Sequence, residues 1–140
     1  MDQGVFELGA RRKVNLNEAN EIIRIISHFT KQMSVEVDRI INQLEAMDPD
    51  NVEKAKVLEA EVEGIIESWN QKVRKLGAQP KGLWMADVDA GDGFYCWKYP
   101  EPEIQYWHDY KSGFPGRISL EEKMETRTSP MHIVVEPNLN

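Results

Sequence analysis

The sequence is poor in cysteine and in long apolar runs. Its 140 residues include one cysteine, Cys96, which excludes an intrachain disulfide and suits a reducing cytoplasm. No apolar run is long enough to span a bilayer, and the first twelve residues lack the apolar stretch of a signal peptide. We therefore expect a soluble cytoplasmic protein with no membrane partner.

Positive charge is also scarce. Lys and Arg number 17 against 24 Asp and Glu, a formal net charge of −7, and the best basic cluster (11–13) has three residues. Because affinity for nucleic acid depends on clustered Lys and Arg, this balance argues against a nucleic-acid partner. A chain of this length buries enough surface to fold without a metal or a disulfide. We expect a single domain over residues 1–140, with no cofactor.

Aromatic residues are scarce before residue 77, where apolar residues recur at helical spacing. Asn15 and Glu18 form a capping-box pattern, Gly77 is a C-terminal stop, and the loop 48–51 is short enough to force two helices antiparallel. Residues 14–77 therefore predict a long helical hairpin with the near-heptad spacing of a coiled coil. The two apolar seams are Ile22, Ile26, Phe29, Met33, Val37, Ile40, Leu44 and Met47, and Ala55, Leu58, Val62, Ile65, Trp69, Val73 and Leu76.

Glycine, proline and aromatic residues are concentrated after residue 77. The stretches GLWMADV and GFYCWKY flank a Gly/Asp cluster typical of a hairpin turn, and EIQYWHDY (103–110) has the composition of a third strand. Residues 82–120 therefore predict a small antiparallel β-sheet of about three strands. In the polar tail 121–140, HIVVE (132–136) is either an added edge strand or disordered. The fold class is α+β.

Seven apolar residues of the predicted hairpin lie off the seam that the two helices share. Two helices alone do not cover them, so the C-terminal half, a second copy of the chain, or both must do so. We expect a homodimer in which four helices share a core. The seven residues are Ile23, Ile25, Val35, Ile41, Val52, Val57 and Ile66.

Four short motifs carry a resemblance to a known family. They are EAN at the start of the first helix, CWK at 96–98, WH at 107–108 and GFPGR at 113–117. With these motifs, the chain resembles the bacterial family catalogued as domain of unknown function 2203, over about Val14 to Leu120. The resemblance implies a fold and a bacterial-type origin. It implies no activity.

The segment 107–117 is the best candidate for a ligand-binding site. Two glycines within four residues predict a specifically shaped loop, and the planar guanidinium of Arg117 suits a carboxylate or a phosphate. The alternative is structural, with Arg117 paired to an acidic neighbour and His108 bonded to a backbone carbonyl. Acidic candidates for that pair are Glu101, Glu103 and Asp109. The candidate ligand-binding residues are Trp97, Glu103, Trp107, His108, Gly113, Phe114, Gly116 and Arg117.

Cys96 and His108 raise two further possibilities, a nucleophile with its base and a metal site. A free cysteine between two aromatic residues is more often a small buried apolar residue, so we predict no catalytic residue. With Asp87 and Asp109 the same two residues offer metal-ligand types, but zinc sites usually contain closely spaced pairs such as C-x-x-C. No metal site is expected.

The aromatic residues of the second half predict two apolar faces on one strand. Strand alternation places Tyr95, Trp97 and Tyr99 on one face, and Phe94 and Cys96 on the other. One face should contact the helices, and the other should contact a partner or a ligand.

Two hypotheses for the function follow. The first is a non-enzymatic interaction or scaffold module that self-associates through its helices, and it predicts that Arg117 is held in an intramolecular pair. The second is a protein that binds a small anionic ligand, or an enzyme, with its site around His108 and Arg117, and it predicts an open cleft on which these two residues converge.

Overall fold

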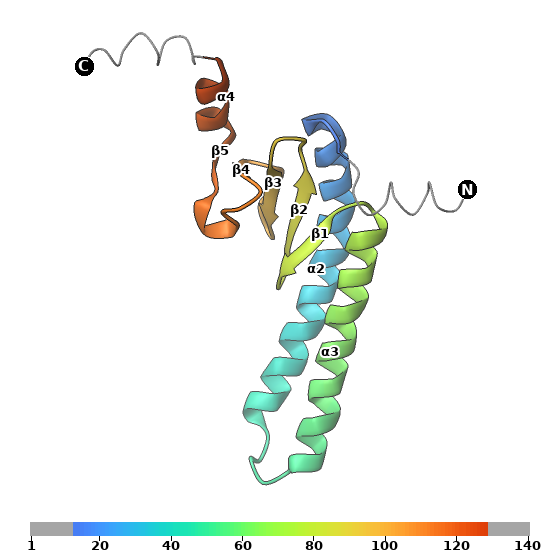
Figure 1. Ribbon diagram of the computed structural model, residues 1–140. Helices are drawn as coiled ribbons and strands as arrows, with labels where there is room; N and C mark the ends of the chain where they lie inside the picture. Colours follow the sequence, from blue (N-terminus) through green and yellow to red (C-terminus); the bar gives the residue numbers. More distant parts are fainter. Residues whose placement is uncertain (1–12, 129–140) are drawn as a thin grey trace, which may run out of the picture.

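The computed structural model describes residues 13–128, and its largest feature is an antiparallel helical hairpin (Figure 1). The two helices are α2 (Leu16–Ala46, 31 residues) and α3 (Val52–Lys75, 24 residues). Asn15 caps α2 as predicted: its Oδ1 accepts from the Glu18 backbone N–H at 2.8 Å, and the Glu18 carboxylate accepts from the Asn15 backbone N–H at 3.1 Å. The predicted capping box is confirmed.

The ends of α3 follow the sequence signals closely. Asn51 caps its first turn, with Oδ1 accepting from the Lys54 backbone N–H at 3.3 Å. Gly77 follows the helix with φ of 92°, the left-handed conformation that favours glycine at this position. Within residues 13–128, no helix combines the length and the apolar character needed to cross a membrane.

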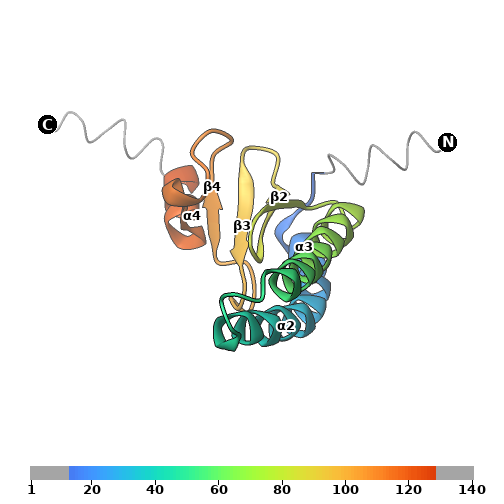
Figure 2. The ribbon, with the colours of Figure 1, turned by 90° about the horizontal axis from the view of Figure 1, so that it is seen from below.

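A single antiparallel sheet follows the hairpin, with its strands in chain order (Figures 1 and 2). The α+β class is confirmed, but the expected number of about three strands is too low. Within residues 13–128 the sheet has five strands: β1 (Gln79–Gly82), β2 (Met85–Asp89), β3 (Phe94–Lys98), β4 (Tyr106–His108) and β5 (Ile118–Ser119).

The first additional strand, β1, arises because the predicted strand from Gly82 to Val88 is interrupted. Trp84 has φ of 58°, so the chain turns there and separates β1 from β2. Pro80 disfavours a strand, yet β1 lies at the edge of the sheet, where a missing N–H is tolerated. The turn after β2 is the predicted Gly/Asp cluster, in which the Ala90 N–H donates to the Gly93 carbonyl at 2.8 Å.

The C-terminal part also differs from the prediction. Of the expected strand 103–110, only β4 is formed, and β5 appears at the end of the expected loop. Residues Leu120–Thr128 form a helix, α4, where the polar tail was predicted. Ser119 and Glu122 bond each other's backbone N–H groups at 3.0 and 3.1 Å, which is a capping box that starts this helix. The segment 132–136 lies outside the described residues.

The core lies between one face of the sheet and the half of the hairpin that the sheet covers. Trp69 and Trp97 are fully buried there, and the Trp69 ring meets Trp84 edge-on with 5.4 Å between ring centroids. The Trp69 indole N–H donates to Thr30 Oγ1 at 2.7 Å, and that hydroxyl donates to the Ile26 carbonyl at 2.6 Å. The core cluster comprises Val14, Ala19, Ile23, Ile26, Trp69, Val73, Ala78, Ala86, Val88, Trp97 and Ile104.

The other half of the hairpin extends beyond the sheet (Figure 1). Of the seven apolar residues predicted to need a cover, Ile23 is buried in the core and Ile66 is half-buried. Five remain exposed. They are Ile25, Val35, Ile41, Val52 and Val57.

Candidate functional site

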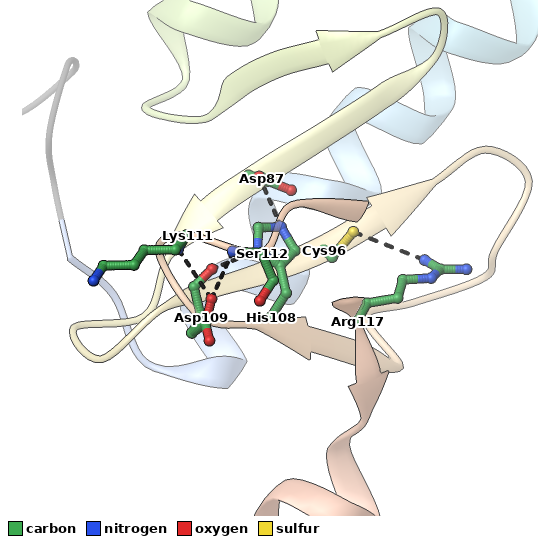
Figure 3. Close-up of polar contacts among 7 residues, drawn as sticks. All are labelled: Asp87, Cys96, His108, Asp109, Lys111, Ser112 and Arg117. Atoms are coloured by element: carbon green, nitrogen blue, oxygen red, sulfur yellow. Dashed lines mark hydrogen bonds and ion pairs between the residues drawn. The ribbon is translucent and has the colours of Figure 1, made fainter. Parts of the chain in front are cut away.

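The face of the sheet that points away from the helices carries a cluster of polar side chains (Figure 3). Antiparallel register places Asp87 of β2 opposite Cys96 of β3, and Cys96 opposite Tyr106 of β4. His108, two residues after Tyr106, projects from the same face of β4. Asp87, Cys96 and His108 are only 3%, 1% and 2% exposed. Three strands therefore bring these groups together in a site screened from water.

His108 is held on both sides by oxygen atoms. Its Nδ1 lies 2.7 Å from the Asp109 carbonyl oxygen, and its Nε2 lies 3.0 Å from Asp87 Oδ2. A carbonyl oxygen only accepts, so Nδ1 carries a hydrogen. One further proton then bridges Nε2 and Asp87, as an imidazolium with a carboxylate or as an imidazole with a carboxylic acid. The expected backbone-carbonyl bond of His108 is thus present, together with a buried acidic partner.

Asp87 and Cys96 are both shifted toward their neutral forms. Burial raises the pKa of Asp87 above its ordinary value, against the opposing charge and hydrogen bond of His108. Burial, followed by the negative charge of Asp87, raises the pKa of Cys96 to about 11. The thiol is therefore protonated at neutral pH. Neither ring nitrogen of His108 is available to remove its proton, so the geometry does not assemble a cysteine nucleophile with a histidine base.

The donor atoms of Asp87, Cys96 and His108 all lie within 4.8 Å of one another. Asp109, the fourth residue considered as a ligand, lies elsewhere. Its carboxylate is exposed and accepts from the backbone N–H groups of Lys111 and Ser112 at 2.9 and 2.7 Å (Figure 3). Hydrogen bonds from Ser112, and then from the Lys111 backbone, lower the pKa of Asp109.

Arg117 is engaged within the chain. Its Nη2 and Nη1 donate to the two carboxylate oxygens of Glu101 at 2.6 and 3.3 Å. Its guanidinium carbon lies 3.8 Å from the ring centroid of Tyr106 and 4.3 Å from that of Phe114, and Nη1 lies 3.9 Å from Cys96 Sγ. Each partner of the ion pair is 17% exposed. The guanidinium fork is therefore occupied by Glu101, one of the three predicted acidic partners.

The glycines of the loop have the structural role that their spacing predicted. Gly113 has φ of 70° and precedes the short 3-10 helix η1 (Phe114–Gly116). A Cβ on Gly116 would lie 2.4 Å from the Cβ of Ser112, so a side chain there requires the loop to shift. The loop carries Phe114 to the guanidinium of Arg117.

The other predicted site residues lie apart from this cluster. Trp97 is fully buried on the helix-facing side, and its indole N–H donates to the Glu101 carbonyl at 2.8 Å. Trp107 pairs with Tyr95 in register and therefore projects from that same side, with its N–H donating to Asp92 at 3.2 Å. Glu103 is exposed. These three residues are not brought together with His108 and Arg117.

The predicted alternation of aromatic faces is present, but the chain itself covers the face expected to meet a partner or ligand. Tyr106 lies beneath Arg117, and the ring of Phe94 meets that of Tyr110 edge-on, with 5.1 Å between centroids. Two surface grooves lie elsewhere. One runs along the hairpin, and the other lies between α3 and β1.

Three residues of the cluster were absent from the predicted ligand-binding set: Asp87, Cys96 and Glu101. A signal existed for Asp87, a charged residue between Ala86 and Val88 in an apolar stretch. In a strand buried on both faces, such a residue needs a partner. The sequence does not show which strand supplies that partner.

Comparison with protein families gives a match over most of the chain. The model of the family described as "Uncharacterized conserved protein (DUF2203)" matches residues 12–120. No curated protein and no solved structure gives a significant match.

Proposed function

Because this chain belongs to the DUF2203 family, whose description names no activity, we propose a function from the structure itself: a non-enzymatic interaction module that self-associates through its helical hairpin. One observation carries the proposal. The hairpin continues beyond the sheet (Figure 1), and a groove between its two helices is lined by a helical glycine, Gly64. The engagement of Arg117 by Glu101 supports this function over an anion site at the sheet.

The groove runs between α2 and α3 and has a volume of about 430 Å³. Met33 and Ile65 contribute apolar surface to it, and the buried side chain of Ile40 also lines it. Met33 also packs against the core cluster beneath the sheet, so the groove continues the core past the point where the sheet ends. An apolar surface continuous with a core is the kind of surface that a further helix covers in a bundle.

Gly64 is the least expected residue in this groove. A glycine inside a helix costs about 1 kcal/mol relative to alanine, so it needs a compensating reason. Within the described chain, a Cβ at position 64 would meet nothing within 4 Å. A glycine is therefore not needed at this position to avoid a clash within the folded protomer. Close approach of another backbone would explain it, as small residues allow helices to approach closely.

A second copy of the chain is the occupant that the groove fits best. A twofold interface brings the same surface together from both protomers, so each must tolerate its own charges. The rim of the groove carries charges of both signs, negative on Glu36 and Glu61 and positive on Arg39. Two hairpins packed through this groove form a four-helix bundle, and each supplies Gly64 at the contact. The five exposed apolar residues of the hairpin lie outside the lining of this groove.

Light scattering at several protein concentrations tests the proposal. We expect the wild type to have the molar mass of a dimer at micromolar concentration and Gly64→Leu to be a monomer with an unchanged circular dichroism spectrum. In the protomer the leucine enters open space and improves helix propensity, so the variant should fold. The matched control is Glu59→Leu, an exposed position of α3 that does not line the groove, and this variant should remain a dimer.

Two outcomes would contradict the proposal. One is a monomeric wild type at every concentration. The other is a Gly64→Leu variant that dimerises as tightly as the wild type.

A further inference from the structure

We infer that Asp87, Cys96 and His108 form a binding site for a divalent transition-metal ion of the zinc type. The inference is independent of self-association, because the three residues lie on the sheet face away from the hairpin. They come from three adjacent strands, and their donor atoms form a triangle with no side longer than 4.8 Å (Figure 3). A sulfur, an imidazole nitrogen and a carboxylate oxygen are the three donor types of protein zinc sites.

The distances are compatible with a tetrahedral ion after a small movement. Bond lengths of about 2.0 to 2.3 Å place neighbouring donors of a tetrahedral zinc site roughly 3.3 to 3.6 Å apart. His108 Nε2 and Asp87 Oδ2, at 3.0 Å, need to separate slightly. The Cys96 sulfur, at most 4.8 Å from the other two donors, needs to approach them by at most about 1.5 Å.

His108 is already oriented as a metal ligand. Its Nδ1–H donates to the Asp109 carbonyl at 2.7 Å, and this bond directs Nε2 toward Asp87 and Cys96. A metal-binding histidine almost always donates its other ring N–H to a carbonyl or carboxylate, which determines the tautomer and the ring angle. The bridging proton between Nε2 and Asp87 occupies the place that the ion would take.

The charges of the site balance when a divalent ion is bound. The Asp87 carboxylate and the Cys96 thiolate together offset the two positive charges of the ion. Arg117, 3.9 Å from the sulfur, is offset by Glu101. A buried assembly of net charge near zero avoids the cost of an unpaired charge in an apolar interior. Without the ion, burial and Asp87 keep the pKa of the thiol raised, so binding of the ion must displace its proton.

The donor set also selects the metal. Mg²⁺ and Ca²⁺ prefer oxygen ligands, whereas a thiolate with an imidazole suits zinc and, as its spectroscopic substitute, Co²⁺. Three protein ligands leave the fourth position of a tetrahedral ion without a ligand from these residues.

Titration with Co²⁺ is the direct test, because the chain has one cysteine. A thiolate-to-cobalt charge-transfer band can arise only from Cys96, and ligand-field bands report tetrahedral geometry. We expect both bands to saturate at one equivalent and to disappear when Zn²⁺ is added. Since the three residues are buried, the metal is supplied both to the folded protein and during refolding from urea.

Variants assign the ligands. Cys96→Ser should abolish the charge-transfer band, and His108→Gln should weaken Zn²⁺ affinity by more than about 100-fold, since loss of an outer-shell partner alone costs roughly 10–100-fold. His28→Gln is the matched control, an exposed histidine outside the donor cluster, and should bind like the wild type. The site is refuted if wild-type protein shows no thiolate-to-cobalt band by either route. It is equally refuted if His108→Gln folds and binds Zn²⁺ with unchanged affinity.

Discussion

The helix-facing side of the sheet and its far side have opposite chemistry, although both are built from β2, β3 and β4. Toward the helices, Ala86, Val88 and Trp97 are fully buried among apolar neighbours. On the far side, Asp87 and His108 are almost as completely buried but pair with each other. Equal burial is thus reached by close packing on one side and by hydrogen bonding on the other. Removing one residue should therefore change the free energy of unfolding in different ways on the two sides.

The largest expected effect is on the packed side. Trp97→Ala should lower the free energy of unfolding by about 3–5 kcal/mol, because it removes a fully buried ring and leaves a cavity. Urea denaturation measures the loss. Trp107→Ala is the control, because that ring is only half-buried and its removal should cost clearly less. Equal losses would show that burial on this side does not determine stability.

The polar side should respond to loss of one partner with a pH dependence. In metal-free protein, His108→Leu should cost about 3 kcal/mol, because Asp87 is left buried without its partner. Burial already raises the pKa of Asp87, and the variant lacks the opposing effect of His108, so the folded variant holds the proton to higher pH. Its stability relative to the wild type should therefore be greatest below about pH 4, near the pKa of an unfolded aspartate, and should fall as the pH rises.

Urea denaturation between pH 4 and pH 8 measures this slope. The matched variant Asp87→Leu removes the carboxylate and should lack the same fall in stability. A His108→Leu variant whose stability relative to wild type does not change with pH would contradict the assignment.

Arg117→Lys should have a smaller effect at the edge of the polar side. Lysine keeps the charge but loses the two-pronged bond to Glu101 and the stacking on Tyr106, a loss of about 1–2 kcal/mol for this partly exposed pair. Arg24→Lys is the control, since Arg24 is an exposed residue of α2 outside the proposed interface and should contribute less than about 0.5 kcal/mol. Thermal unfolding of the two variants shows whether the two-pronged guanidinium contact of Arg117 contributes more to stability than an exposed arginine does.

The smallest effect concerns the polar contact inside the helix-side core. Thr30→Val keeps the shape of the side chain but leaves the Trp69 indole N–H without its acceptor, which should cost about 1 kcal/mol. The loss of unfolding free energy, measured by urea denaturation, should be well below that of His108→Leu, because the Thr30 hydroxyl and the Trp69 indole are both neutral. A loss as large as that of the charged pair would mean that charge does not distinguish the two sides.

The hairpin was predictable because its signals are local. The capping box at Asn15, the stop at Gly77 and the apolar periodicity each act within a few residues of sequence, so their meaning does not depend on distant contacts. The edge strand β1 was missed because Pro80 and Lys81 have little strand propensity, and only pairing with β2 places them in the sheet. Trp84, at φ of 58°, adopts its conformation beside Trp69, a contact that no local pattern encodes.

The candidate site was predictable only in part. The sequence indicated Arg117 with an acidic partner, and Glu101 is one of the three candidates. It offered Asp87, Cys96 and His108 as residues of metal-ligand types, but no site was predicted from them because they lack the close ligand spacing of known zinc motifs. Strand register makes them neighbours, with Asp87 opposite Cys96 and His108 on the next strand.

The sequence by itself determined the helical hairpin, its ends, the α+β class and the two-faced character of β3. Periodicity, capping and turn residues determine these features through contacts between near neighbours. Only the tertiary structure decided the number of strands, the neighbours of His108 and the end of the hairpin that the sheet leaves uncovered. These features depend on register and packing between distant segments, and a one-residue change of register would turn every side chain to the other face.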